Sequence, residues 1–223
     1  MSNFTYLALG DSYTIGEKVL PEDNFPNQTI TALNKTAAEL SNRRQALQPL
    51  TGLQSNPDGD YRFGAPKIIA QTGWTTNELN AAIDTASISK TYDIVSLLIG
   101  VNNQYRGRSA DDFKNEFEHL LQRSIQFAGN KPNHVFVVSI PDWGVTPFAE
   151  GRDSKSVADE IDVYNLVCQK SAAVFKTHFI NITDSQREDG NKTEFLAPDG
   201  LHPSGKEYKK WADKLADAIL KQL

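Results

Sequence analysis

The sequence is poor in cysteine. Cys168 is the only cysteine among 223 residues. A lone cysteine cannot form an internal disulfide, so the fold does not depend on oxidation. Cys168 lies within the helical pattern VYNLVCQKSAAVF. We therefore expect a buried thiol that packs as a small apolar side chain and takes no part in catalysis.

Long apolar runs and concentrated charge are also missing. No stretch approaches the ~20 apolar residues of a membrane-spanning helix, so no membrane span is expected. The net charge is −5 and no run of like charge is present. This balance argues against a nucleic-acid partner, which needs a concentrated basic face. No basic segment precedes the first apolar run, which favours a cytoplasmic protein, although a chain that had lost an export signal would look the same.

Five short runs rich in β-branched residues are present instead. They are FTYLAL from Phe4, KIIAQ from Lys67, DIVSLLIG from Asp93, HVFVVSI from His134 and HFINI from His178. The third and fourth are almost continuously apolar, as in strands buried on both faces. Helical patterns lie between and after them, at residues 26–42, 75–88, 109–128, 156–176 and 204–222.

This alternation predicts an α/β fold of three layers, α/β/α, with a doubly wound, five-stranded parallel sheet. We expect a single domain over residues 1–223, because no repeat or linker interrupts the pattern. Residues 43–65 are polar and rich in turn formers. They predict a long excursion between the first helix and the second strand.

Chemically useful residues follow the predicted strands. The strand-end loops are GDSYTIGE, QTGWTT, GVNNQYRG, IPDWGVTPF and APDGLHPSG. Parallel sheets bind ligands at the carboxyl ends of their strands, where these loops meet. Ser12 in the first loop and Asp199 and His202 in the last match what nucleophilic catalysis needs, namely a nucleophile, a base and a carboxylate that orients the base.

Other interpretations exist for two of these patterns. GDSYTIG between a strand and a helix is also typical of a loop that cradles phosphate, but Asp199 and His202 favour a catalytic serine. Glu116 and His119 have the spacing of half of a metal-binding motif. The motif has no second copy, so we expect a solvated helix face and no metal site.

Four motifs in order resemble those of the SGNH hydrolases, also called GDSL esterases and lipases. GDSYTIGE resembles the nucleophile block, TGW the glycine block, GVNN the Gly-x-Asn-Asp block and DGLHPS the Asp-x-x-His block. The match runs from the first predicted strand to the last predicted helix. The resemblance implies the flavodoxin-like fold of that family and a hydrolase that uses no cofactor.

The resemblance also implies roles for individual residues. Ser12 is the expected nucleophile, His202 the general base and Asp199 the residue that orients it. The backbone N–H groups of Ser12 and Gly73 and the side-chain amide of Asn102 are the expected oxyanion hole. Asn103 departs from the family, which usually has Asp there, and we expect it to be structural.

Several side chains beside these loops are candidates for substrate contact. Trp74, Tyr105, Trp143 and Phe148 either line an acyl or alcohol pocket or serve packing. Arg106 and Arg108 either receive an anionic group of a substrate or form hydrogen bonds within their loop.

The expected function is hydrolysis of carboxylic esters, with short acyl chains, through an acyl-enzyme on Ser12. The expected partner is a small-molecule ester, and the sequence does not indicate an oligomeric state. Alternatives within the family are a carbohydrate O-deacetylase and a lysophospholipase or thioesterase. A non-catalytic binding protein on the same fold is the alternative from a different class.

Overall fold

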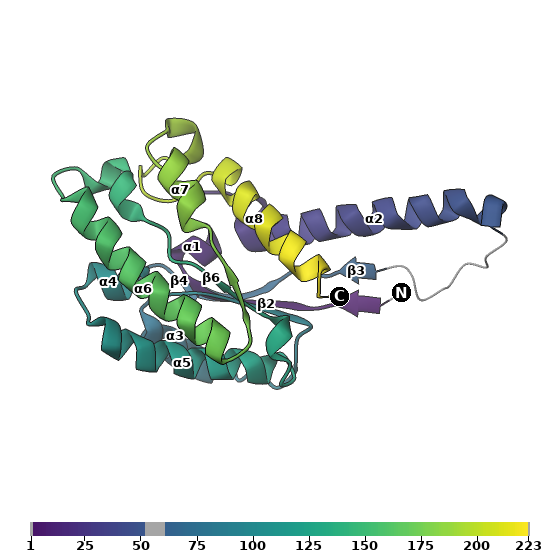
Figure 1. The fold of residues 1–223 in the computed structure, drawn as a ribbon, viewed down its shortest axis with the longest axis horizontal. Helices are drawn as coiled ribbons and strands as arrows, with labels where there is room; N and C mark the ends of the chain where they lie inside the picture. Colours follow the sequence, from purple (N-terminus) through teal and green to yellow (C-terminus); the bar gives the residue numbers. More distant parts are fainter. Residues whose placement is uncertain (1, 52–60, 223) are drawn as a thin grey trace.

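The protein is described by a computed structural model that covers the backbone of residues 2–51 and 61–222 and the side chains of residues 3–43 and 61–222. Five parallel strands form its central sheet in the order β4-β2-β5-β6-β7 (Figure 1). They are β2 (Tyr6–Asp11), β4 (Lys67–Gln71), β5 (Ile94–Leu98), β6 (Val135–Val138) and β7 (His178–Ile180). The predicted five-stranded parallel sheet is confirmed. The chain reverses its winding direction between β2 and β5, so the carboxyl ends of these strands flank the topological switch point.

Helices flank the sheet. The long ones are α2 (Phe25–Thr51), α3 (Thr76–Ala86), α5 (Ala110–Phe127), α6 (Ser154–Val174) and α8 (Gly205–Leu220). The short ones are α1 (Ser12–Ile15), α4 (Val101–Tyr105) and α7 (Thr183–Asp189). The 3-10 turns are η1 (Pro21–Asp23), η3 (Pro132–His134), η4 (Trp143–Val145), η5 (Pro147–Ala149) and η6 (Thr193–Phe195). Helix α2 packs against α8, and α5 packs against both α3 and α6 (Figure 1).

Local chemistry fixes the helix boundaries near the switch point. The N–H of Thr75 donates to Glu78 Oε2 (2.8 Å), which forms part of a capping box at the start of α3. Ser109 Oγ accepts the N–H of Asp112 (3.0 Å) at the start of α5. Both helix starts agree with the sequence patterns. The strands β2, β5 and β6 are buried along their whole length, so the switch point rests on a rigid core.

The region between the first helix and the second strand of the sheet differs from the prediction. Helix α2 continues to Thr51, well past residue 42, and β3 (Tyr61–Phe63) pairs in parallel with β1 (Ser2–Phe4). Both side-chain ends of Asn34 bind the main chain of Phe63 at 2.9 Å. Residues 43–48, RRQALQ, are good helix formers but show no apolar stripe, and Pro49 is a helix breaker, so the sequence pattern did not reveal this extension. The remainder of the predicted excursion, residues 52–60, lies outside the described residues.

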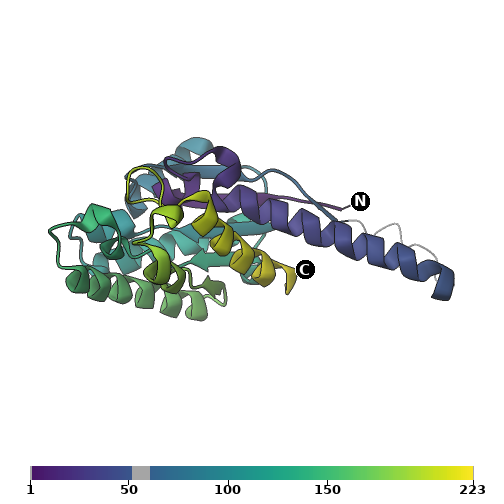
Figure 2. The ribbon, with the colours of Figure 1, turned by 90° about the horizontal axis from the view of Figure 1, so that it is seen from above.

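The second half of α2 and the β1–β3 pair project together from the end of the main sheet (Figure 2). Cys168 is buried in α6, and burial raises the pKa of its thiol, as expected for a side chain that packs and does not react. Within the described parts of the chain, no helix combines the length and apolar character needed to cross a membrane.

Candidate active site

The end of strand β2 presents Ser12. The strand ends at Asp11, whose carboxylate accepts the N–H of Tyr13 (3.0 Å) and so caps the short helix α1 at the residue before Ser12. A Cβ at Gly10 would lie 2.5 Å from the carbonyl oxygen of Leu98 in the neighbouring strand. Position 10 therefore requires glycine, and the tight packing fixes where Ser12 leaves the sheet.

Ser12, His202 and Asp199 form a continuous hydrogen-bonded chain. Ser12 Oγ lies 2.9 Å from His202 Nε2, and His202 Nδ1 lies 2.7 Å from Asp199 Oδ2. The Tyr13 ring lies 4.9 Å from the imidazole, centroid to centroid, and His202 is buried. The structure thus brings together three residues that lie at opposite ends of the chain.

Asp199 is held as a carboxylate. Burial alone raises the pKa of this group, but the hydrogen bond from the His202 ring outweighs it together with the N–H groups of His202 and Leu201, each 3.0 Å from Oδ1. The pKa of Asp199 therefore lies below its ordinary value. An ionised Asp199 fixes the tautomer of His202 that leaves Nε2 free to accept the serine proton.

Asn102 and Gly73 lie at the neighbouring strand ends. Asn102 Nδ2 donates one hydrogen to the carbonyl of Trp74 (2.9 Å), which leaves its second hydrogen available. Gly73 has a φ of +83°, a backbone conformation that favours glycine. Asn103 is buried, and its amide exchanges two hydrogen bonds with Thr76, at 3.1 Å and 2.7 Å, so it joins α4 to the start of α3.

A small cavity of about 190 Å³ opens over Ser12. Its lining consists of Ser12, Tyr13, Thr72, Gly73, Val101, Asn102, Tyr105, Trp143, Phe148, Leu201 and His202. Three of the four predicted aromatic side chains are among these residues, and Tyr105 lies 5.3 Å from Trp143 and 6.2 Å from Phe148 between ring centroids. Trp74 is not; it packs against the core, and its contribution to the site is the carbonyl that holds Asn102.

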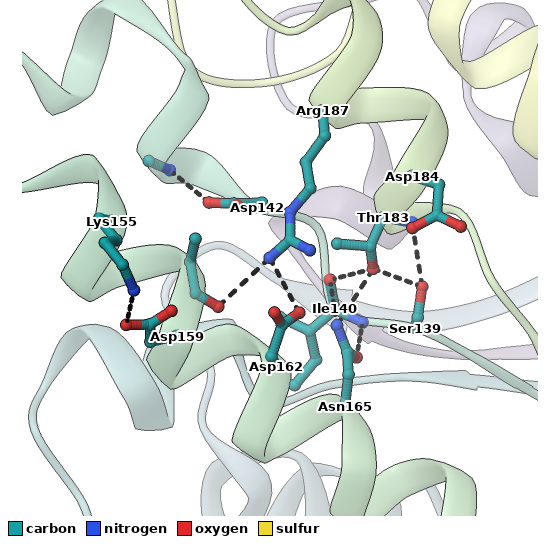
Figure 3. Close-up of polar contacts among 12 residues, drawn as sticks. Ser139, Ile140, Asp142, Lys155, Asp159, Asp162, Asn165, Thr183, Asp184 and Arg187 are labelled. Atoms are coloured by element: carbon teal, nitrogen blue, oxygen red, sulfur yellow. Dashed lines mark hydrogen bonds and ion pairs between the residues drawn. The ribbon is translucent and has the colours of Figure 1, made fainter.

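The aromatic side of the cavity is anchored by residues that the sequence motifs did not indicate. Asp142 is fully buried and accepts hydrogen bonds from Gly144 N (2.9 Å) and Arg187 Nε (2.8 Å). Arg187 projects from α7 and also pairs with Asp162 on α6 at 2.9 Å (Figure 3). Trp143, between Asp142 and Gly144, donates its indole N–H to Gln104 (2.8 Å). The carboxylate in IPDW was the available sequence signal, but its partner lies 45 residues away.

The two candidate arginines both form internal contacts. Arg106 Nη2 donates to the carbonyl of Gly73 (2.7 Å), and its Nη1 lies 3.3 Å from Glu78. Arg108 Nη1 donates to Asn77 (2.9 Å) and lies 3.6 Å from Glu116.

Glu116, from the predicted half of a metal-binding motif, forms a hydrogen bond and an ion pair within the protein. Glu116 accepts a hydrogen bond from the Thr76 hydroxyl in addition to its contact with Arg108. Among the side chains of residues 3–43 and 61–222, no cluster of three or more histidine, cysteine or acidic residues has the arrangement of a metal site.

A hydrogen-bonded Ser–His–Asp chain at the carboxyl edge of a doubly wound sheet is the arrangement that serine hydrolases use. The chain belongs to the GDSL-like lipase/acylhydrolase family, whose model matches residues 8–210. The resemblance carried by the four sequence motifs is therefore confirmed. No functionally curated protein matches the chain.

Solved structures of several hydrolases share the fold. A lipase/acylhydrolase from Enterococcus faecalis is 19% identical, with a TM-score of 0.65 over 100% of this chain and 97% of the other. The psychrotrophic esterase EstA from Pseudoalteromonas sp. is 15% identical, with a TM-score of 0.64 over 97% of each chain. The acetyl xylan esterase AlAXEase is 18% identical, with a TM-score of 0.64 over 96% of this chain and 98% of the other. At these identities the likeness concerns the fold.

Proposed function

We propose that the protein is a serine esterase that hydrolyses carboxylic esters with short acyl chains through an acyl-enzyme on Ser12. The observation that carries the proposal is the unbroken hydrogen-bonded chain from Ser12 through His202 to Asp199. Family membership supports the same class of reaction. A non-catalytic binding protein would have no use for this chain of proton-transferring groups.

The geometry supports a two-step reaction. Ser12 Oγ attacks the ester carbonyl while His202 Nε2 takes its proton, and Asp199 stabilises the resulting imidazolium. The N–H groups of Ser12 and Gly73 and the free amide hydrogen of Asn102 bind the tetrahedral oxyanion. His202 then protonates the leaving alcohol and activates a water molecule, which releases the acid and frees Ser12.

The cavity favours a short, apolar acyl group. Its volume of about 190 Å³ is below the ~300 to 1,000 Å³ typical of pockets for drug-sized ligands. Among the described residues, no lysine, arginine or acidic side chain lines it. Of its polar side chains, the Thr72 hydroxyl donates to Glu17 and the Trp143 indole to Gln104, whereas the Tyr13 hydroxyl has no partner among the described residues. Because no charged side chain is present to bind a phosphate head group, a lysophospholipase ranks below a simple esterase. A carbohydrate deacetylase stays the alternative that the experiments below test.

The test is hydrolysis of p-nitrophenyl esters from acetate to laurate by the wild type and by Ser12→Ala. We expect activity that is highest on the shortest chains and absent in the variant. Because the base must be neutral, kcat/KM should fall at acid pH in a single ionisation step. Since the pKa of Asp199 is lowered, Asp199 stays ionised in mild acid and adds no second step.

Labelling with a fluorophosphonate separates the remaining alternatives. If no ester is hydrolysed but Ser12 is labelled, the enzyme acts on a more specific ester, such as an acetylated sugar. If no ester is hydrolysed and Ser12 is not labelled, the proposal is wrong and a binding protein is favoured. If Ser12→Ala hydrolyses esters as well as the wild type does, the acyl-enzyme on Ser12 is wrong.

A further inference from the structure

Three consecutive residues, Thr72, Gly73 and Trp74, form what we call the oxyanion loop. Each is bound by a different side chain from outside the loop. The Thr72 hydroxyl donates to Glu17, the Gly73 carbonyl accepts from Arg106 (2.7 Å), and the Trp74 carbonyl accepts from Asn102 (2.9 Å). Asn102 has an assigned role, whereas Glu17 and Arg106 have none.

Glu17 and Arg106 bind the oxyanion loop from two different segments of the chain. Glu17 directly follows the C-cap of α1, and its N–H donates to the carbonyl of Ser12 (3.0 Å). It therefore connects the nucleophile turn to the oxyanion loop. Arg106 directly follows α4, the helix that carries Asn102. The segments that carry two proposed oxyanion donors, the Ser12 N–H and the Asn102 amide, thus both contact the oxyanion loop.

The contact between Arg106 and the Gly73 carbonyl bears on the orientation of the Gly73 N–H. The φ of +83° at Gly73 is a backbone conformation that other residues rarely adopt, and its N–H has no hydrogen-bond partner among the described residues. The carbonyl of the same residue accepts from Arg106, and the N–H of Trp74 in the same peptide unit donates to the carbonyl of Gln71 (3.3 Å). These two contacts hold the peptide unit that follows Gly73 and so restrict one of the backbone torsions that set the direction of its N–H.

We propose that Arg106 is a positioning residue of the oxyanion hole, which orients the Gly73 N–H through the Gly73 carbonyl, and that Glu17 does the same from the nucleophile side. The inference rests on the proposed esterase function. Preorganised donors stabilise a transition state more than donors that must first be oriented, so the loss is expected in kcat and not in KM.

The geometry argues against Arg106 as a receptor for substrate anions. Its two terminal nitrogens are engaged with Gly73 and Glu78, and it does not line the cavity. Glu78 in turn accepts the N–H of Thr75, so Arg106 reaches both ends of the segment between β4 and α3. Its ion pair with Glu78 is exposed and contributes little by itself.

The experiment compares Arg106→Ala, Arg106→Lys and Arg108→Ala on neutral p-nitrophenyl esters, after wild-type activity and Ser12 labelling have been established. Arg108 is the matched control, because it is two residues away and bonds Asn77 and Glu116 but not the oxyanion loop. We expect Arg106→Ala to lower kcat about tenfold, below the ~100-fold or more of a direct donor, with KM within twofold. Lysine should restore part of kcat, and Arg108→Ala should match the wild type.

A second readout removes the ambiguity of a folding defect. The affinity for a boronic acid that forms a tetrahedral adduct with Ser12 should fall about tenfold in Arg106→Ala, while the thermal midpoint changes no more than in Arg108→Ala. Glu17→Ala should lower kcat similarly, and Glu17→Gln, which still accepts from Thr72, should lower it less.

The inference is wrong if Arg106→Ala keeps wild-type kcat and boronate affinity, or if it raises KM only for esters that carry an anionic group. Either result leaves the esterase function intact. A wild type that neither hydrolyses esters nor labels at Ser12 would instead remove the proposed function itself.

Discussion

The two sides of the Ser12 cavity are held in different ways. On one side, every residue of the oxyanion loop is bound by a separate side chain. On the other side lies what we call the aromatic loop, residues 142–148, which carries Trp143 and Phe148. It is held mainly near its ends, by Asp142 with Arg187 and by the N–H of Phe148, which donates to the carbonyl of Gly200 (3.1 Å).

The difference corresponds to what each side has to recognise. A developing negative charge is stabilised only by donors that already point at it, so small rotations of the oxyanion loop are costly. An apolar acyl group is recognised by shape and by removal of surface from water, which has no direction. We infer that damage to the oxyanion loop lowers turnover, whereas damage to the aromatic loop changes substrate preference and stability.

The largest effect is expected from Asn102→Ala. This change removes the amide hydrogen that we propose binds the oxyanion, and the bond to Trp74 at 2.9 Å. We expect kcat to fall roughly 100- to 1000-fold with little change in KM, as for other lost oxyanion donors. Steady-state kinetics on a short p-nitrophenyl ester measures both constants.

Asn103→Ala is the control, because the neighbouring side-chain amide is buried and, among the described residues, binds only Thr76. It should lower the free energy of unfolding by about 1 to 2 kcal/mol and leave kcat within a few fold of the wild type. If the two asparagine variants lose turnover equally, Asn102 has no special part in the reaction and the assigned oxyanion hole is wrong.

A smaller effect is expected from Arg187→Ala on the aromatic side. The change leaves the fully buried carboxylate of Asp142 without its cation, and we expect the free energy of unfolding to fall by about 2 to 3 kcal/mol. KM should rise while kcat is largely kept, because the triad does not contact this network. Chemical denaturation and kinetics on the same samples test both statements.

The pair Lys155 and Asp159 on α6 provides the control (Figure 3). Both side chains are mostly exposed, so Lys155→Ala should leave the free energy of unfolding almost unchanged. Equal destabilisation by the two variants would show that Arg187 acts as an ordinary surface charge and that Asp142 needs no partner.

The same contrast explains how much the sequence revealed. Strand and helix patterns predicted the five-stranded sheet, because buried parallel strands are continuously apolar and the helices alternate with them. Ser12, Gly73 and Asn102 lie in short motifs that follow strands, where the topology alone brings them to one edge. Local patterns of this kind predict structure without knowledge of long-range contacts. The expectation of a strand-end loop is wrong for Asp199 and His202, because α7 and η6 lie between β7 and their motif.

The sequence did not predict which side chains far apart along the chain contact each other. Arg187 reaches Asp142 across 45 residues and Arg106 reaches Gly73 across 33, and neither pairing leaves a pattern in the local sequence. The pairing of β1 with β3 was missed for a related reason, since three-residue strands are too short to show a period. Periodicity reports the face that a segment buries, and it does not report which side chain meets which.

The smallest effect is expected from Phe148→Ala, which tests whether the aromatic loop sets acyl-chain length. Phe148 is 47% exposed at the edge of the cavity, so its loss should cost little stability. The cavity should widen, and kcat/KM for hexanoate relative to acetate should rise about fivefold, within the range by which apolar pockets discriminate chain length.

Leu166→Ala is the matched control for Phe148→Ala, because Leu166 is 46% exposed on α6 and does not line the cavity. The ratio should not change in that variant. An unchanged ratio in Phe148→Ala as well would mean that the ring does not contact the acyl chain. The backbone anchor from Phe148 to Gly200 does not involve the ring, so truncation leaves the loop attached beside Asp199. A change in the ratio with kcat on acetate preserved would therefore come from the shape of the cavity and not from a displaced triad.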